Sequence, residues 1–170
     1  VQTCALPILL RETQLVVCLL FQYAGMSFVD FAHLKERNIK NGILDYNRQK
    51  TGTPMRLEIL DTAELMRKEL MGDKRPASGY LFPFLSGTKT GYEAYLEYNA
   101  ALSRFNRNLK ALKKAAGIAS DVTSYTIRHS FAMALKEQNV PIEMISELLG
   151  HKSIKTTQIY LRSFSLEKRS

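Results

Sequence analysis

Apolar residues repeat with a helical period at the start of the chain and again in its second half. Residues 9–23 are predicted to form a helix that Gly25 ends, and residues 26–34 a second, short helix. The strongest signal lies in residues 92–116, where apolar side chains recur every three or four positions. That periodicity predicts a long helix with one buried stripe.

Between these helices the period changes to two. Residues 42–60 alternate in two runs around a turn-forming segment, Thr-Gly-Thr-Pro, and this pattern predicts a β-hairpin. Side chains alternate across a strand, so one face of the first strand is predicted to carry Leu44, Tyr46, Arg48 and Lys50. The chain is therefore expected to be mostly helical, of class α+β, with a small antiparallel sheet.

Further helix boundaries follow from capping residues. Asp61 is a suitable N-cap for a helix, and Pro141 suits the first position of another. Gly150 is placed to stop that second helix, and Ser153 to cap the last one, which contains Tyr160.

Charge changes this picture by suggesting a partner. The chain of 170 residues has a net charge of +8, which favours a polyanion such as double-stranded DNA, although basic proteins also arise for solubility alone. Many of the cations lie on the predicted long helix, which has no acid between residues 100 and 119. Such a run is either an ordinary solvated face or a phosphate-contacting one, and we favour the latter. Its members are Arg104, Arg107, Lys110, Lys113 and Lys114.

Composition narrows the remaining classes of protein. The 45% hydrophobic content can supply a core, but no apolar run reaches the roughly 20 residues that span a bilayer, so we expect no membrane partner. Cys4 and Cys18 lack metal-ligand spacing, and no metal site is predicted. A reducing bacterial cytoplasm is the simplest setting, with nucleoid association when DNA is bound.

The first eight residues, VQTCALPI, show neither a signal-peptide pattern nor helical periodicity. They back-translate into a common sequencing adapter, so we interpret residues 1–8 as a non-native tail, with a disordered native terminus as the alternative. Residues 9–170 then form the domain of interest.

Two segments carry residues suited to chemistry. TSYTIRHSFAMAL places Arg128 and His129 near the start of a predicted helix, and ISELLGHKSIKTTQIY places His151 nine residues before Tyr160. Taken singly, each is weak, and an isolated Tyr160 would be interpreted as a packing residue. In this order and spacing they resemble the catalytic domain of tyrosine recombinases, the phage integrase family, and in particular Bacteroides-type integrases.

The resemblance implies a reaction and a set of roles. Members of the family cut and rejoin DNA through a 3′-phosphotyrosine, which requires no cofactor, neither metal nor ATP. Tyr160 would be the nucleophile, Arg128 a phosphate-clamping arginine and His151 a hydrogen-bond donor to the phosphate. Lys50 would be the general acid, with an ordinary turn lysine as the alternative, and His129 a structural hydrogen-bonding residue.

The chain departs from the family pattern at its first arginine. Depending on the alignment, that position holds Ala24 or Ser27, and rescue by Arg11 or Arg56 is one explanation. Asp30 matches the acidic residue that usually braces the missing arginine. Tyr125 stands where a histidine is usual.

The resemblance further implies a homotetramer acting on paired DNA sites, and a full-length protein with an N-terminal core-binding domain that residues 9–170 lack. Three alternatives stay open. The chain could be an impaired integrase that only binds DNA, as Ala24 would favour, or a relative of type IB topoisomerases. It could also be a helix-turn-helix regulator built on VPIEMISELLGH.

Overall fold

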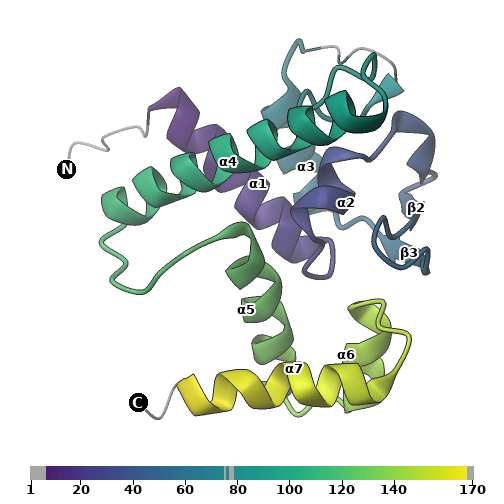
Figure 1. The fold of residues 1–170 in the computed structure, drawn as a ribbon, viewed down its shortest axis with the longest axis vertical. Coiled ribbons are helices and arrows are strands. Elements are labelled where there is room, and N and C mark those ends of the chain that lie inside the picture. The colour runs from purple at the N-terminus through teal and green to yellow at the C-terminus, as the bar shows by residue number, and fades with distance from the viewer. Residues whose placement is uncertain (1–6, 75, 77–78, 168–170) are drawn as a thin grey trace.

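The computed structural model describes residues 7–74, 76 and 79–167, so most of the predicted non-native tail lies outside the described residues. It confirms a mostly helical α+β fold with a small antiparallel sheet (Figure 1). In chain order the elements are α1 (Ile8–Gln22), α2 (Phe28–Ala32), the 3₁₀ turn η1 (Glu36–Asn38), β1 (Ile39–Lys40), β2 (Ile43–Asn47), β3 (Pro54–Glu58), α3 (Asp61–Met71), α4 (Gly91–Ala115), α5 (Ser124–Glu137), α6 (Ile142–Leu148) and α7 (Ile154–Glu167).

Helices α1 and α4 pack in the larger of two hydrophobic clusters, and α4 crosses over α1 in Figure 1. The predicted apolar stripe of α4 is buried at Phe105 and Leu109, which are 4% and 2% exposed. Phe105 stacks on Phe28 of α2 with ring centroids 4.7 Å apart. The helical period thus fixed which face of α4 joins the core.

A sharp reversal follows α1. Ala24 and Gly25 both have positive φ, 55° and 62°, a conformation that glycine adopts far more readily than other residues. A Cβ on Gly25 would lie 2.9 Å from the side chain of Phe131 on α5, so the glycine also permits this close approach. The reversal brings the backbone of Gly25 against α5.

The sheet has the order β1-β2-β3, and all pairs are antiparallel. Leu44 and Tyr46 of β2 are buried, whereas Asp45 and Asn47 are exposed, as the alternating pattern predicts. Strand β1 was not predicted. It joins β2 through a turn at Asn41-Gly42, whose positive φ angles of 50° and 75° fit a type I′ turn.

The predicted extent of the first hairpin strand was too long. Strand β2 ends at Asn47, and the amide of Arg48 donates to the carbonyl of Thr53 at 2.9 Å, which closes the turn. Lys50 therefore lies in an exposed turn rather than on the strand. The side chain of Arg48 is buried all the same.

Most helix boundaries were predicted to within one residue, but the second helix, predicted over residues 26–34, is shorter and spans Phe28–Ala32. Leu60, not Asp61, is the N-cap of α3, and Pro141 is the N-cap of α6 rather than its first residue. Gly150, with a φ of 61°, follows the end of α6 as predicted. The hydroxyl of Ser153 accepts the amide of Lys155 at 3.3 Å before α7.

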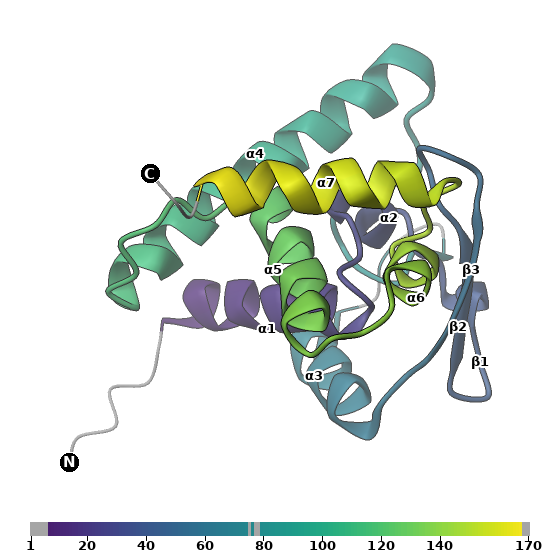
Figure 2. The same ribbon diagram turned by 90° about the horizontal axis from the view of Figure 1, so that it is seen from below.

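Helices α5, α6 and α7 enclose the second, smaller cluster. Figures 1 and 2 show α5 running from the layer of α1 and α4 to the pair α6 and α7. Among the described residues, the buried members of this smaller cluster are Ala132, Ile145, Leu149 and Leu161. None of the described helices combines the length and apolar character needed to cross a bilayer.

Candidate active site

The predicted nucleophile, Tyr160 on α7, lies among three aromatic rings. Its centroid is 5.6 Å from that of His129, 5.8 Å from His151 and 5.9 Å from Tyr125, each in an edge-on arrangement. Burial and a hydrogen bond with Tyr125 raise the pKa of Tyr160, while the nearby charge of Arg128 acts in the opposite direction. The phenol is therefore protonated at neutral pH.

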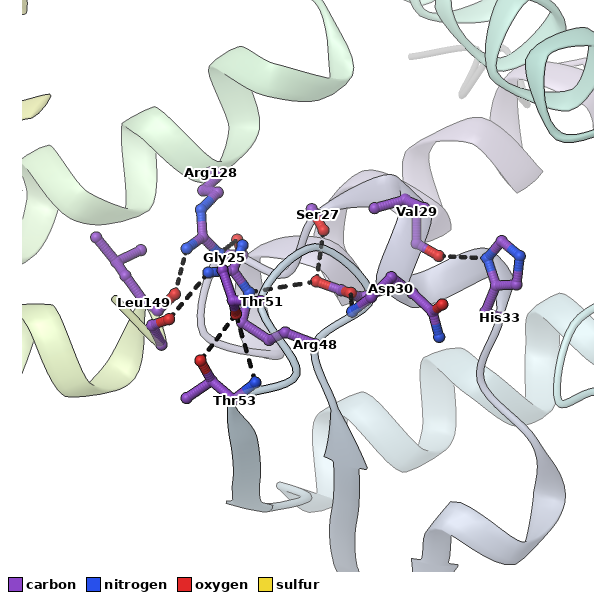
Figure 3. Close-up of polar contacts among 12 residues, drawn as sticks. Gly25, Ser27, Val29, Asp30, His33, Arg48, Thr51, Thr53, Arg128 and Leu149 are labelled. Atoms are coloured by element: carbon purple, nitrogen blue, oxygen red, sulfur yellow. Dashed lines mark hydrogen bonds and ion pairs between the residues drawn. The ribbon is translucent and has the colours of Figure 1, made fainter. Parts of the chain in front are cut away.

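Arg128 reaches out of α5 to two backbone carbonyls. Its Nη1 donates to the carbonyl of Gly25 at 2.9 Å, and its Nη2 donates to the carbonyl of Leu149 at the end of α6 (Figure 3). The residue is only 6% exposed. Burial and the charge of Arg48 lower its pKa. Arg128 thus joins both hydrophobic clusters through one guanidinium group.

His151 directly follows the glycine that ends α6. Its Nδ1 lies 2.8 Å from the hydroxyl of Thr157, a fully buried residue of α7. Burial and the charges of Arg128 and Arg48 lower the pKa of His151 to about 4. The imidazole is therefore neutral at pH 7 and held in place by Thr157. Thr157 precedes Tyr160 by three residues in the ISELLGHKSIKTTQIY segment, but sequence reasoning gave it no role.

Asp30 of α2 connects the α1–α2 reversal to the hairpin turn. One of its carboxylate oxygens, Oδ2, accepts the hydroxyl of Ser27 at 2.5 Å, and the other, Oδ1, accepts the amide of Gln49 at 2.7 Å. Arg48 Nε is 3.6 Å from Oδ2, and the carboxylate is almost fully buried (Figure 3). The predicted supporting residue therefore contacts the hairpin.

Arg48 is a site residue that sequence reasoning missed. Its Nη1 donates to the carbonyl of Gly150 at 3.0 Å, so the hairpin turn contacts the loop that carries His151. A Cβ on Gly150 would lie 2.6 Å from both Arg48 Cδ and Met55 Sδ, which explains the glycine there. The alternating pattern did place Arg48 on the buried face of the hairpin and was the available signal.

Other predicted residues lie outside this cluster. Lys50 is exposed and makes no hydrogen bond or ion pair with any part of the chain that the structure describes. Ala24 is buried and supplies no cation. On α4, Lys113 pairs with Asp121 at 3.1 Å. The remaining four predicted DNA-binding residues are exposed on that helix: Arg104, Arg107, Lys110 and Lys114.

Within the described residues, no group of three or more His, Cys, Asp or Glu side chains is arranged to hold a metal ion. The cluster instead offers two buried guanidinium groups, a neutral imidazole and a phenol. This combination suits an anion with several oxygens next to an electrophilic centre.

The chain shares short stretches with curated tyrosine recombinases. It is 52% identical over 54 residues to tyrosine recombinase XerD of Lacticaseibacillus casei, a match covering 32% of this chain and 18% of that protein. It is 46% identical over 59 residues to tyrosine recombinase XerC of Rickettsia canadensis, covering 35% and 19%. The matched stretches therefore span about a fifth of those relatives.

Solved structures show the same fold over most of the chain. The XerA recombinase aligns with a TM-score of 0.58 and 22% identity, covering 94% of this chain and 63% of that one. The Tn1549 transposon integrase in complex with a circular intermediate DNA has a TM-score of 0.64 and 16% identity, covering 86% and 52%.

A lambda integrase dimer bound to a core site has a TM-score of 0.58 and 19% identity, covering 92% of this chain and 43% of that one. The model of the phage integrase family matches residues 8–167, nearly the whole chain. With this match and the shared fold, the chain belongs to the phage integrase family.

Proposed function

We propose that this chain is the catalytic part of a site-specific DNA recombinase that cleaves and rejoins double-stranded DNA through a 3′-phosphotyrosine. The observation that carries the proposal is the position of Tyr160, packed against His151 and within electrostatic range of the buried Arg128. Two of the similar structures, those of the Tn1549 and lambda integrases, are complexes with DNA, and this supports DNA as the partner.

The proposed reaction exchanges one phosphate ester for another. Tyr160 Oη attacks the phosphorus, an oxygen–phosphorus bond forms, and the bond to the 5′ oxygen breaks. The phenolic proton passes to solvent on attack, and the departing 5′ oxygen gains a proton that we propose Lys50 donates. Rejoining reverses both steps. Because the number of phosphate esters is unchanged, the reaction requires no energy source.

The remaining groups either contact the phosphate or hold in place the groups that do. Arg128 stabilises the additional negative charge of the transition state, and neutral His151 donates a hydrogen bond to a phosphate oxygen. Tyr125, His129 and Asp30 hold these groups in place. We further propose that the active assembly is a homotetramer on paired sites, located in the bacterial cytoplasm and on the nucleoid when it is bound to DNA.

Covalent trapping tests the proposal. The chain is incubated with a pool of nicked duplexes of randomised sequence, in which loss of a short strand makes cleavage irreversible. We expect a protein–DNA adduct that survives denaturing electrophoresis, with nucleotide attached to the peptide that contains Tyr160. Mass spectrometry of the digested adduct identifies the linked residue.

Tyr160→Phe is the matched control, because it removes one oxygen and keeps the ring contacts. No adduct is expected from this variant. An adduct of equal yield from Tyr160→Phe would show that another residue is the nucleophile and would refute the proposal. An adduct that appears only in Ala24→Arg would instead identify an impaired enzyme on an intact scaffold.

A further inference from the structure

Two guanidinium groups converge on the loop that follows α6. Arg128 Nη2 donates to the carbonyl of Leu149, and Arg48 Nη1 donates to the carbonyl of Gly150, the next residue, at 3.0 Å (Figure 3). Arg128 comes from α5 and Arg48 from the β2–β3 turn. Two segments that are distant in sequence therefore place positive charges next to adjacent backbone carbonyls. Both residues are buried, at 6% and 7% exposure.

The positive charge of this pair exceeds the negative charge around it. Asp30 is the one carboxylate ion-paired with either guanidinium among the described residues, and its contact to Arg48 is long, at 3.6 Å. Its two oxygens already accept hydrogen bonds from Ser27 and Gln49. Burial and, after it, the like charge of Arg48 lower the pKa of Arg128. Buried excess charge is costly unless an anion completes it.

Arg48 also has unused hydrogen-bonding capacity. A guanidinium group has five N–H donors. Of the side-chain nitrogens of Arg48, only Nη1 makes a hydrogen bond to the described residues, and Nε is buried without one. An arginine whose sole task was to hold the Gly150 loop would leave this capacity unexplained. Nε faces Asp30, whereas Nη2 makes no hydrogen bond to the described residues and is the donor that a bound phosphate oxygen would use.

We propose that Arg48 is the second phosphate-binding arginine of this site and supplies the guanidinium that Ala24 and Ser27 lack. It would bind the scissile phosphate together with Arg128, while Asp30 orients it. The inference rests on the proposed function, because it assigns a ligand to the same site. Arg11 is unsuited to this role, since Glu69 holds it in a bidentate pair on the surface at 2.7 and 2.9 Å. Arg56 is unsuited as well, because it lies on the exposed face of β3, away from the face on which Met55 contacts the Gly150 loop.

Binding of inorganic phosphate tests the inference without any catalysis. Thermal unfolding of the chain is measured in phosphate and in chloride at equal ionic strength. We expect phosphate to raise the midpoint by roughly 3–6 °C when its concentration is about ten times the dissociation constant. The double variant Arg48→Gln with Asp30→Asn removes both partners of the buried pair, and its phosphate affinity should fall at least tenfold.

Arg56→Gln is the matched control, because Arg56 is an exposed arginine of the same hairpin. Its response to phosphate should equal that of the unaltered chain. Arg48→Lys covers the case in which the double variant fails to fold, since lysine keeps a charge beside Asp30 but cannot form a bidentate contact. Phosphate affinity undiminished in these Arg48 variants, or no phosphate effect in the unaltered chain, would overturn the inference.

The adduct assay separates this inference from the proposed function. Where the unaltered chain forms a Tyr160-dependent adduct, the Arg48/Asp30 double variant should form it about 10²–10³-fold more slowly, and Arg56→Gln at the normal rate. An equal rate in the double variant would overturn the role of Arg48 and leave the proposed function intact. If no Tyr160-dependent adduct forms but phosphate still stabilises the chain in an Arg48-dependent way, the result would count against the proposed function and not against phosphate binding by Arg48.

Discussion

At the scale of single residues, His151 is neutral because it is partly buried and lies near two arginines. Burial and the charges of Arg128 and Arg48 lower its pKa from 6.5 to about 4. An unfolded chain has no such environment, so the unfolded state binds a proton near pH 6.5 and the folded state only near pH 4. The neutral imidazole therefore contributes stability above pH 6.5, and that contribution is lost as the pH falls from 6.5 to 4.

We accordingly expect the free energy of unfolding to fall across this window by about 1–2 kcal/mol on account of His151, a figure reduced for the solvent screening of a half-buried group. His151→Gln should flatten the dependence, and the difference between the two curves isolates this residue from the carboxylates. Proton NMR of the imidazole should give a midpoint near 4. A midpoint near 6.5 would show that neither burial nor the arginine charges perturb His151.

At the scale of elements, α4 exposes a basic face that lies outside the tyrosine cluster. Arg107, Lys110 and Lys114 are exposed, and α4 itself has no acidic residue after Glu97. Each phosphate contact releases counterions, and it steepens the fall of log affinity with log salt concentration by about 0.9 in slope. Phosphate contact by this face would therefore be measurable without knowing the recombination site.

We expect the triple variant Arg107→Gln, Lys110→Gln and Lys114→Gln to bind duplex DNA more weakly and to reduce the salt slope by roughly 2–3. Fluorescence anisotropy with a labelled duplex at several NaCl concentrations measures this slope. The control removes the same net charge from other elements, at three exposed cations: Arg37, Lys68 and Lys89. Equal effects of the two triple variants would show that the basic face of α4 is an ordinary solvated face and does not contact phosphate.

The elements that could be predicted from the sequence are those specified by local periodicity. The stripe of α4 and the alternation of Leu44 and Tyr46 need only neighbouring side chains, and both predictions were confirmed. Strand β1 is two residues long, so it has no period to recognise. The Asn41-Gly42 turn was its one signal and was overlooked.

The site was less predictable because its contacts are distant in sequence. Arg48 meets the carbonyl of Gly150 across 102 positions, and Arg128 meets that of Gly25 across 103. Backbone carbonyls belong to every residue, so no motif records which one accepts a bond. The motifs pointed to Tyr160, Arg128 and His151, whereas no motif predicts the contact of Arg48 with the loop after α6.

At the scale of the whole molecule, the site lies between two hydrophobic clusters of unequal size. Asp30 and Arg48 belong to the part built on α1–α4 and the sheet, and His151 and Tyr160 to the part built on α5–α7. Among the described residues the smaller cluster has four buried members, so α6 and α7 are expected to open at a lower free energy than α1. Such opening would separate Tyr160 from Arg48 and Asp30.

Hydrogen–deuterium exchange with a matched pair of cavity variants tests this division. Leu149 and Leu19 are both fully buried, one in each cluster, and replacing either by Ala should cost about 2–5 kcal/mol. Leu149→Ala should speed exchange mainly in α6 and α7, because α1 can remain folded when those helices open. Leu19→Ala should speed exchange throughout, because the smaller cluster packs on the larger one through α5. Identical exchange patterns in the two variants would mean that both clusters unfold as one unit, and Tyr160 would then leave the site only on global unfolding.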